Sequence, residues 1–254
     1  MKTHKTKTLT LITFLCSLTL IAQTKLAIIN DPDGFTFVRN GQGKDFSVVD
    51  TLYKEDFFYF EFVDSSDWVK ISAWKGRQIE GFIHNSRVQI VGNLSLQKQK
   101  ELITKILNRQ RILAISFYNA WKTKDSIAYR KSIRELESYN DTKYDPILDI
   151  LSKYICKTSD SNILQLFFAT LLADKGSANE LPSFSIGDCF ICNPNFVIQQ
   201  LAKINDKEEK MLICDHIEWG LINQFNIEED KKSDNPEFNR LKKLLDKEKK
   251  KASP

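Results

Sequence analysis

The sequence predicts an α+β protein in two parts, a small all-β domain followed by an all-α helical bundle or stack of helix pairs. Short apolar runs, separated by turn residues at intervals of about 8–12 positions, fill residues 25–91. From residue 95 onward the apolar spacing becomes that of amphipathic helices. The second part contains no strand-like run, and the chain has no Gly-rich phosphate loop. These two features exclude doubly wound α/β chemistry.

Composition sets the first limits on function. The chain has 254 residues, of which 28% are charged and 42% hydrophobic, and this excludes a disordered chain, a collagen-like fibre and a multi-span membrane protein. The formal net charge is +4, and residues 1–22 contribute three lysines without an acid, so the remainder carries only +1. A net charge that small gives no electrostatic footprint for nucleic acid, and no nucleic-acid partner is predicted.

Residues 1–22 are predicted to be a signal peptide. A basic segment with Lys2, Lys5 and Lys7 precedes 14 uncharged, mostly apolar residues. This run is shorter than the about 20 residues that a membrane span needs. A lipoprotein attached at Cys16 and an uncleaved anchor are the alternatives. We expect export to the periplasm or the extracellular space, with membrane contact only through the signal peptide during export.

Residues 25–91 are predicted to form short strands. Apolar runs lie at 26–29, 35–37, 46–49 and 52–53, and an aromatic strand follows at 57–63. In that strand, alternation places Phe58, Phe60 and Phe62 on one face, with Phe57 and Tyr59 on the other. Runs at 68–73, 79–83 and 88–90 complete a small barrel or sandwich.

Four sequence blocks in this part resemble motifs of the bacterial SH3-like (SH3b) domain. Residues 34–43 (GFTFVRNGQG) are similar to the family's opening Asn-Val-Arg and Gly-rich loop, and 51–56 (TLYKED) to its threshold strand and Lys-Gly-Asp turn. Residues 68–71 (WVKI) resemble its Trp-x-Lys-Val strand, and 81–88 (GFIHNSRV) its closing motif. The resemblance covers about a quarter of the chain. Phe37, Gln42 and Phe82 depart from it, where the family has Asn, Pro and Trp.

The resemblance implies a five- or six-stranded barrel without catalytic residues, of a kind that often serves as a docking module beside cell-wall enzymes. A peptidoglycan peptide or an envelope protein is the partner that it suggests. Trp74, beside the Lys75-Gly76 turn, is the aromatic residue most expected to be exposed, and the candidate ligand-binding residues are Trp74, Tyr53 and Tyr59. We expect His84 to pack or to cap a turn rather than to act in catalysis.

Residues 94–226 are predicted to form an α-helical domain. Helical faces cover 95–117, 125–137, 145–155 and 163–173, with breaks at Asn140-Asp141, Ser159-Asp160 and Lys175-Gly176. Further helices begin near 181, 193 and 205, and the last is expected to end at Gly220. Residues 227–254 form a polar, Lys-rich tail in which a final amphipathic helix is plausible. We expect that helix to be solvated or frayed, with contact to a membrane surface or an acidic polymer as the alternative.

Cys189-Phe-Ile-Cys192, together with Cys214 and His216, offers a Cys3His zinc site or a thiol redox pair on paper. Both are disfavoured, because the first pair falls within a helix and no βαβ unit surrounds it. We therefore expect Cys156, Cys189, Cys192 and Cys214 to be structural, as buried thiols or disulfides, and we predict no metal and no cofactor. Pairing of Cys192 with Cys214 is favoured, because pairing of Cys189 with Cys192 on one helix is strained.

The sequence thus predicts an exported, non-catalytic envelope protein that binds or docks through an SH3-like domain. Two other classes stay open. One is a hydrolase or thiol-redox protein whose site lies in the helical domain, and the other is an immunity or inhibitor protein that blocks a secreted toxin. A nucleophilic enzyme would need a Ser or Cys paired with His84 or His216, the only histidines after His4. His84 belongs to the β part and His216 to the helices, and among the scattered Asp and Glu residues no spacing singles out a pair of carboxylates.

Overall fold

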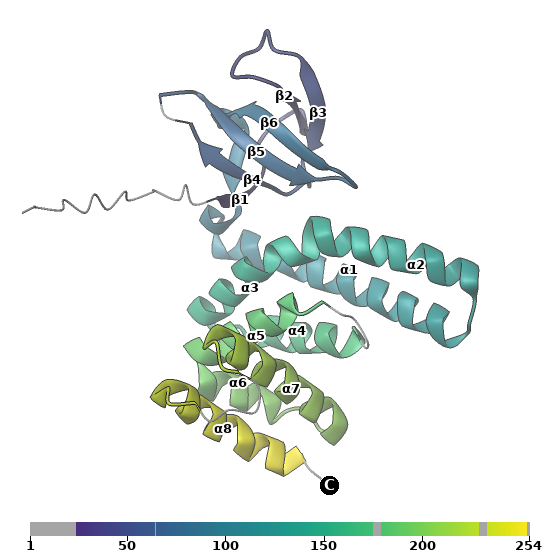
Figure 1. The fold of residues 1–254 in the computed structure, drawn as a ribbon, viewed down its shortest axis with the longest axis vertical. Helices are drawn as coiled ribbons and strands as arrows, with labels where there is room; N and C mark the ends of the chain where they lie inside the picture. The colour runs from purple at the N-terminus through teal and green to yellow at the C-terminus, as the bar shows by residue number, and fades with distance from the viewer. Residues whose placement is uncertain (1–23, 64, 175–178, 229–232, 253–254) are drawn as a thin grey trace, which may run out of the picture.

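The computed structural model describes residues 24–63, 65–174, 179–228 and 233–252, and the predicted signal peptide lies outside this part of the chain. The protein is α+β, with an antiparallel sheet followed by a helical stack (Figure 1). The strands are β1 (Lys25–Ile29), β2 (Phe35–Arg39), β3 (Val48–Tyr53), β4 (Phe58–Phe62), β5 (Trp68–Trp74), β6 (Gln78–His84) and β7 (Val88–Ile90).

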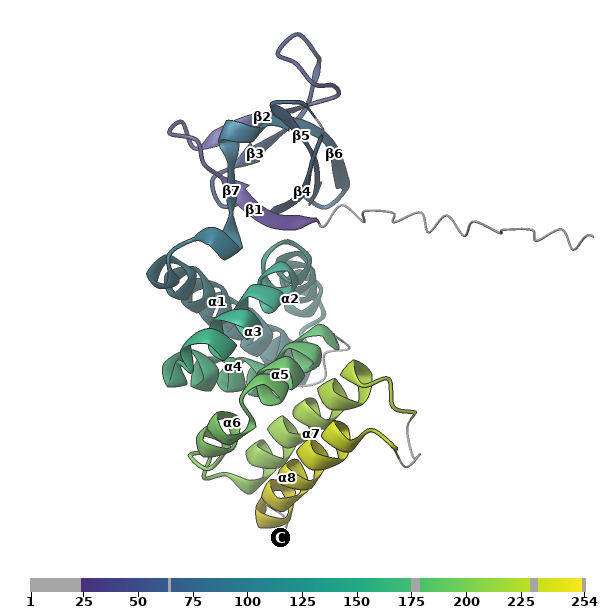
Figure 2. The same ribbon diagram turned by 90° about the vertical axis from the view of Figure 1, so that its left-hand side faces the viewer.

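The sheet is strongly curled but open. Its strand order is β3-β2-β6-β5-β4-β1-β7, and every pairing is antiparallel. Figure 2 shows the strands bending around a common interior. Within the described residues β3 and β7 are the two ends and do not pair with each other. The interior is filled by side chains that alternate along the strands: Ala27, Val38, Leu52, Phe58, Phe60, Val69, Ile71, Ile79 and Ile83.

The helices follow after a short link that contains the 3-10 turn η2 (Val91–Asn93). They are α1 (Leu96–Lys122), α2 (Ser126–Tyr139), α3 (Asp145–Thr158), α4 (Ser161–Ala173), α5 (Leu181–Cys192), α6 (Pro194–Leu201), α7 (Lys207–Gln224) and α8 (Pro236–Ala252). Helices α1 and α2 form a hairpin that reaches sideways beneath the sheet, and α3–α8 continue the stack away from it (Figure 1).

Local caps explain most helix starts. Ser95 Oγ accepts from the backbone N–H of Lys98, which begins α1, and Asp125, Asp160 and Asp206 cap α2, α4 and α7 in the same way. The predicted break at Asn140-Asp141 is confirmed as the end of α2 at Tyr139, but the connection to α3 is not an open turn. The chain instead passes from α2 to α3 through a π-helix, η3 (Asn140–Tyr144), because the backbone stays in the right-handed helical region on both sides of it.

Two further expectations for the helical part differ from the structure. Helix α7 runs past Gly220 to Gln224, so that glycine is internal. The final helix, α8, is neither solvated nor frayed, because Phe238, Leu241 and Leu245 are buried in the core shared by the other helices. Lys249 of α8 also pairs with Asp215 of α7 at 2.6 Å. The predicted break at Lys175-Gly176 lies outside the described residues.

Candidate binding surfaces

All three candidate aromatic residues lie on the outer face of the sheet, and two of them end their strands. Tyr53 ends β3 and is 57% exposed, and Trp74 ends β5 and is 44% exposed. Their neighbours Leu52 and Ala73 are buried inside, so the two-residue alternation of a strand directs Tyr53 and Trp74 outward. Both are therefore placed to meet a partner.

The β5–β6 turn holds these two residues at one end of the sheet. Lys75 follows Trp74 directly, and its ammonium nitrogen lies 4.8 Å from the centre of the Tyr53 ring. The same nitrogen donates to the carbonyl oxygen of Thr51 at 2.8 Å. Arg77 pairs with Asp50 at 2.5 Å. Lys75 and Arg77 therefore both hold the β5–β6 turn against β3. Lys75 contacts Tyr53, and Trp74 precedes Lys75 in the chain; we call these three residues the aromatic end.

Two phenylalanines extend the aromatic end along β2. Phe35 stands opposite Tyr53 in the β2–β3 register, and its ring centre lies 5.5 Å from that of Phe37. Both rings are exposed. We did not predict them as surface residues, although their alternation with the buried Val38 was a usable signal. The resulting surface combines three exposed rings on adjacent strands with a lysine, an arrangement suited to an extended peptide.

Tyr59, the third candidate, is 41% exposed on the part of the outer face that lies nearer to the helices. Burial raises the pKa of its phenol above the usual value, and the carboxylates of Asp149 and Asp145 add to the rise. Both carboxylates belong to α3. Tyr59 is therefore part of the junction between sheet and helices.

The junction is both apolar and charged. The side chains of Leu26 and Phe57 point away from the interior of the sheet and pack in the main helical core. The ammonium group of Lys143, on η3, lies 5.4 Å from the centre of the Phe57 ring, donates to the carbonyl oxygen of Glu55, and pairs with Asp56 at 3.7 Å. Burial lowers the pKa of Lys143, while the charges of Asp56 and Glu55 oppose that change.

The histidines take structural positions. His84 Nδ1 accepts from the backbone N–H of Ser86 at 3.3 Å and caps the 3-10 turn η1 (Asn85–Arg87), which confirms the expected capping role. His216 of α7 bonds through Nδ1 to Ser183 Oγ of α5 at 2.8 Å. A serine–histidine pair is the contact that a hydrolase would need. Ser183 is buried, however, and a nucleophile must be open to its substrate, so we do not assign this pair a catalytic role.

The predicted pairing of Cys192 with Cys214 is wrong. Cys192 is bonded to Cys156 of α3, with α-carbons 5.8 Å apart, and not to Cys214. Helix α5 packs on both α7 and α3, and Cys192, at its C-terminal end, lies on the side that meets Cys156 of α3. Cys189 and Cys214 are buried free thiols, and burial raises both pKa values, that of Cys214 to about 11. Because Cys192 is in a disulfide, the Cys3His zinc site and the Cys189–Cys192 redox pair are both excluded in this state.

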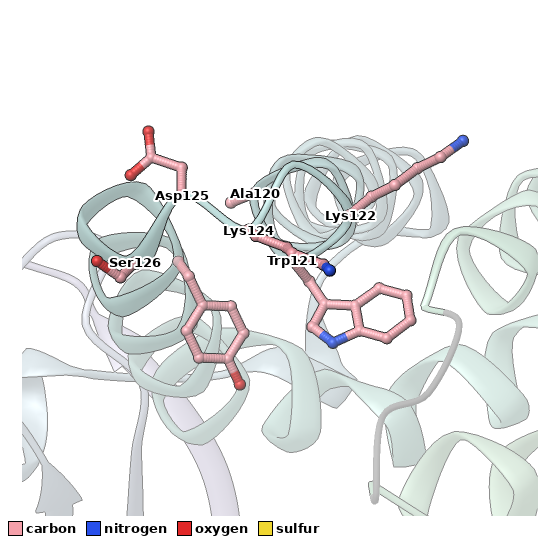
Figure 3. A pocket seen from close by; sticks show the side chains of 7 residues that line it. Ala120, Trp121, Lys122, Lys124, Asp125 and Ser126 are labelled. Carbon is pink, nitrogen blue, oxygen red and sulfur yellow. The ribbon is translucent and has the colours of Figure 1, made fainter.

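A shallow surface at the tip of the α1–α2 hairpin was not predicted. A pocket of about 430 Å³ lies there, lined mainly by Trp121, Lys122, Lys124 and Tyr129. In Figure 3 the indole of Trp121 and the carboxylate of Asp125 point away from each other across the turn. Two further pockets also lie on this hairpin, one along α2 around Arg130 and one between the helices around Arg109.

Comparisons with known proteins find no matching family model, no matching curated protein and no matching solved structure. Among the described residues, no group of three or more His, Cys, Asp or Glu side chains is placed to hold a metal ion. No described helix combines the length and the apolar character that crossing a bilayer requires.

Proposed function

We propose that the chain is an exported, non-catalytic envelope protein that binds a partner through an SH3-like β domain. The observation that carries the proposal is the aromatic end, where the ammonium group of Lys75 lies over the exposed ring of Tyr53 and the exposed Trp74 precedes Lys75 in the chain. Exposed large rings held by a rigid strand pair lose little conformational freedom on binding, which makes them effective anchors for a partner. The resemblance of residues 25–91 to SH3b domains supports the same conclusion.

The partner proposed is a peptidoglycan peptide or a protein of the cell envelope. An extended peptide can lie across β2 and β3 with its side chains on Phe35 and Tyr53, which are directly opposite in the register. Lys75 and Arg77 at the same end are paired with Asp56 and Asp50, so the exposed rings rather than charge would carry the binding.

The experiment is a co-sedimentation and pull-down assay with the mature full-length chain, using isolated cell walls and envelope extract. The test variant is Tyr53→Ala/Trp74→Ala, and the matched control is Phe62→Ala, which removes another exposed ring of the same sheet. We expect the double variant to lose at least about tenfold in affinity, since anchor residues each contribute about 1–2 kcal/mol. Unchanged capture by the double variant would contradict the proposal.

Export is tested separately. Intact-mass measurement of the protein from the envelope fraction should show a chain that lacks about 22 residues, the length of the predicted signal peptide. A chain that still begins at Met1 would contradict cleavage and favour an anchor.

A further inference from the structure

Positive charge is concentrated in the α1–α2 hairpin. Residues 105–134 contain eight Lys or Arg and one Asp, a net charge of +7, whereas the whole chain carries +4. The other residues together therefore carry −3. A segment so unlike the rest of the chain sets up a local positive potential that the overall charge conceals.

Much of this charge has no carboxylate partner. Lys122, Lys124 and Arg130 are exposed, and none of them takes part in an ion pair within the described part of the chain. The one acid of the segment, Asp125, is engaged as the cap of α2, where its Oδ1 accepts from the backbone N–H groups of Ile127 and Ala128 at 3.0 and 2.9 Å. The hairpin therefore presents cations that are free to meet an external anion. Lys105 and Lys131 differ, since they pair with Glu55 and Glu135.

The same tip exposes large apolar side chains. All seven residues from Trp121 to Ile127 are exposed, with Trp121 at 59% and Ile127 at 82%. Ile112 and Ile115 continue the exposed apolar side chains along α1. The tip is held in shape from inside, because the rings of Phe117 and Tyr129 lie 5.5 Å apart across the two helices. A soluble surface does not ordinarily place its largest apolar residues at a protruding turn between lysines.

The tip also lies far from the main core. Helix α1 has 27 residues and is about 40 Å long. Its last residue in the main core is Leu107, and beyond that point a small cluster of Leu113, Ala114 and Leu136 joins α1 to α2. Figure 1 shows the hairpin projecting to one side of the stack. A flat surface can therefore reach the tip without meeting the rest of the molecule.

We propose that the α1–α2 hairpin docks the protein on an anionic phospholipid surface, with Trp121 and Ile127 entering the headgroup region. The basic residues near the tip would contact lipid phosphates, and the apolar residues would reach the acyl boundary, as interfacial anchors do. Nucleic acid would neutralise the positive charge of the hairpin but would leave Ile127 in water. This inference goes beyond the proposed function, because it uses an element outside the β domain and does not depend on it.

The test measures binding of the mature full-length protein to vesicles of phosphatidylcholine, with and without a fraction of phosphatidylglycerol. Sedimentation gives the partition coefficient, and a vesicle-induced change in tryptophan fluorescence that is lost in Trp121→Ala reports entry of Trp121, one of four tryptophans, into an apolar environment. We expect binding only to the anionic vesicles, and weaker binding as salt screens the charges. Lys122→Gln/Lys124→Gln should weaken binding by about fivefold for each lysine removed. Trp121→Ala/Ile127→Ser should weaken it at least tenfold, by roughly the loss of two buried apolar side chains.

Matched controls keep the result interpretable. Phe62→Ala and Leu181→Ser remove exposed apolar side chains elsewhere, and Lys243→Gln/Lys247→Gln removes two exposed lysines of α8. These three should bind the anionic vesicles as the unmodified protein does. All the substituted side chains are exposed, so circular dichroism and melting temperature should show the fold to be intact.

Three results would overturn the proposal. They are absence of binding to anionic vesicles, tip variants that bind as well as the unmodified protein, and binding to double-stranded DNA or polyglutamate that competes with vesicles and survives Trp121→Ala/Ile127→Ser. The last result would assign the hairpin to an anionic polymer instead. None of these measurements uses the aromatic end, so failure here and failure of the proposed function are distinguishable.

Discussion

Gly187 of α5 and Gly220 of α7 lie back to back, so close that a β-carbon on Gly220 would come within 2.9 Å of the Gly187 α-carbon. That added carbon would also overlap the carbonyl oxygen of Ser183. Backbone atoms cannot rotate away as a side chain can, so the two helices could only separate. The packing of α5 on α7 therefore depends on the absence of side chains at these two positions.

Gly220→Ala should destabilise the protein by about 2 kcal/mol, because forced separation of packed helices outweighs the better helix propensity of alanine. The control is Gly92→Ala, whose added carbon would meet only Ile150 at an ordinary 3.8 Å. Urea unfolding of both variants checks the difference. Equal stability of the two variants would show that α5 and α7 can move apart without cost.

The Cys156–Cys192 disulfide closes a separation of 36 residues. In the loop-entropy model a bond over this interval stabilises the protein by about 4 kcal/mol. Cys156→Ser/Cys192→Ser should lose roughly that amount, and reducing agent should lower the melting temperature of the unmodified protein but not of the double variant. Thiol titration of the denatured, unreduced mature chain should find two thiols, from Cys189 and Cys214. Four thiols would contradict the bond.

Phe57 connects the sheet to the helices, because it packs in the main helical core while belonging to the β part of the chain. Phe57→Ala should cost about 3 kcal/mol and lower the stability of both parts together. Phe62→Ala, at an exposed position of β4, should stay within about 0.5 kcal/mol of the unmodified protein. Far-ultraviolet and near-ultraviolet circular dichroism, followed during melting, separate the two outcomes. A loss confined to the β signal would support two independent domains.

His216 should make stability depend on pH. Burial beside Ser183 lowers its pKa below the ordinary 6.5, although Asp215 opposes the change. The unfolded chain therefore binds a proton more readily than the folded one, and stability should fall as pH drops below about 6.5. His216→Asn should show a smaller fall over the same range. Urea unfolding at pH values between about 7 and 5.5 tests this, and identical pH profiles would contradict it.

The change from strands to helices could be predicted from the sequence because the apolar period changes from two to near four residues. Strand β7 ends at Ile90 and α1 begins at Leu96, on either side of the predicted boundary. Helix starts were also accessible, since Asp160 and Asp206 carry the capping side chains. A helix cap depends only on residues that are close in sequence, so these helix starts could be predicted without tertiary information.

Contacts between elements far apart in the sequence could not be predicted in the same way. Alternation shows that Phe57 and Tyr59 face away from the sheet interior, but not that helices cover that face. Gly220 resembles a helix end in sequence, whereas its role is set by a partner 33 positions away, Gly187. Trp121 and Ile127 look like core residues until the hairpin is seen to project beyond the core. The disulfide depends on which helices are neighbours, and sequence spacing does not determine that.

The open sheet has a consequence for how the protein behaves in concentrated solution. Strand β3 ends the sheet in the described part of the chain, and its Val48 and Val49 are exposed. An uncovered strand edge is a template on which a second copy can add its own strand, and apolar residues along it favour such addition. Asp50 and Arg77 at this edge form a neutral ion pair, so they add little repulsion between two copies. Concentrated samples are therefore the ones expected to self-associate, along the edge of β3.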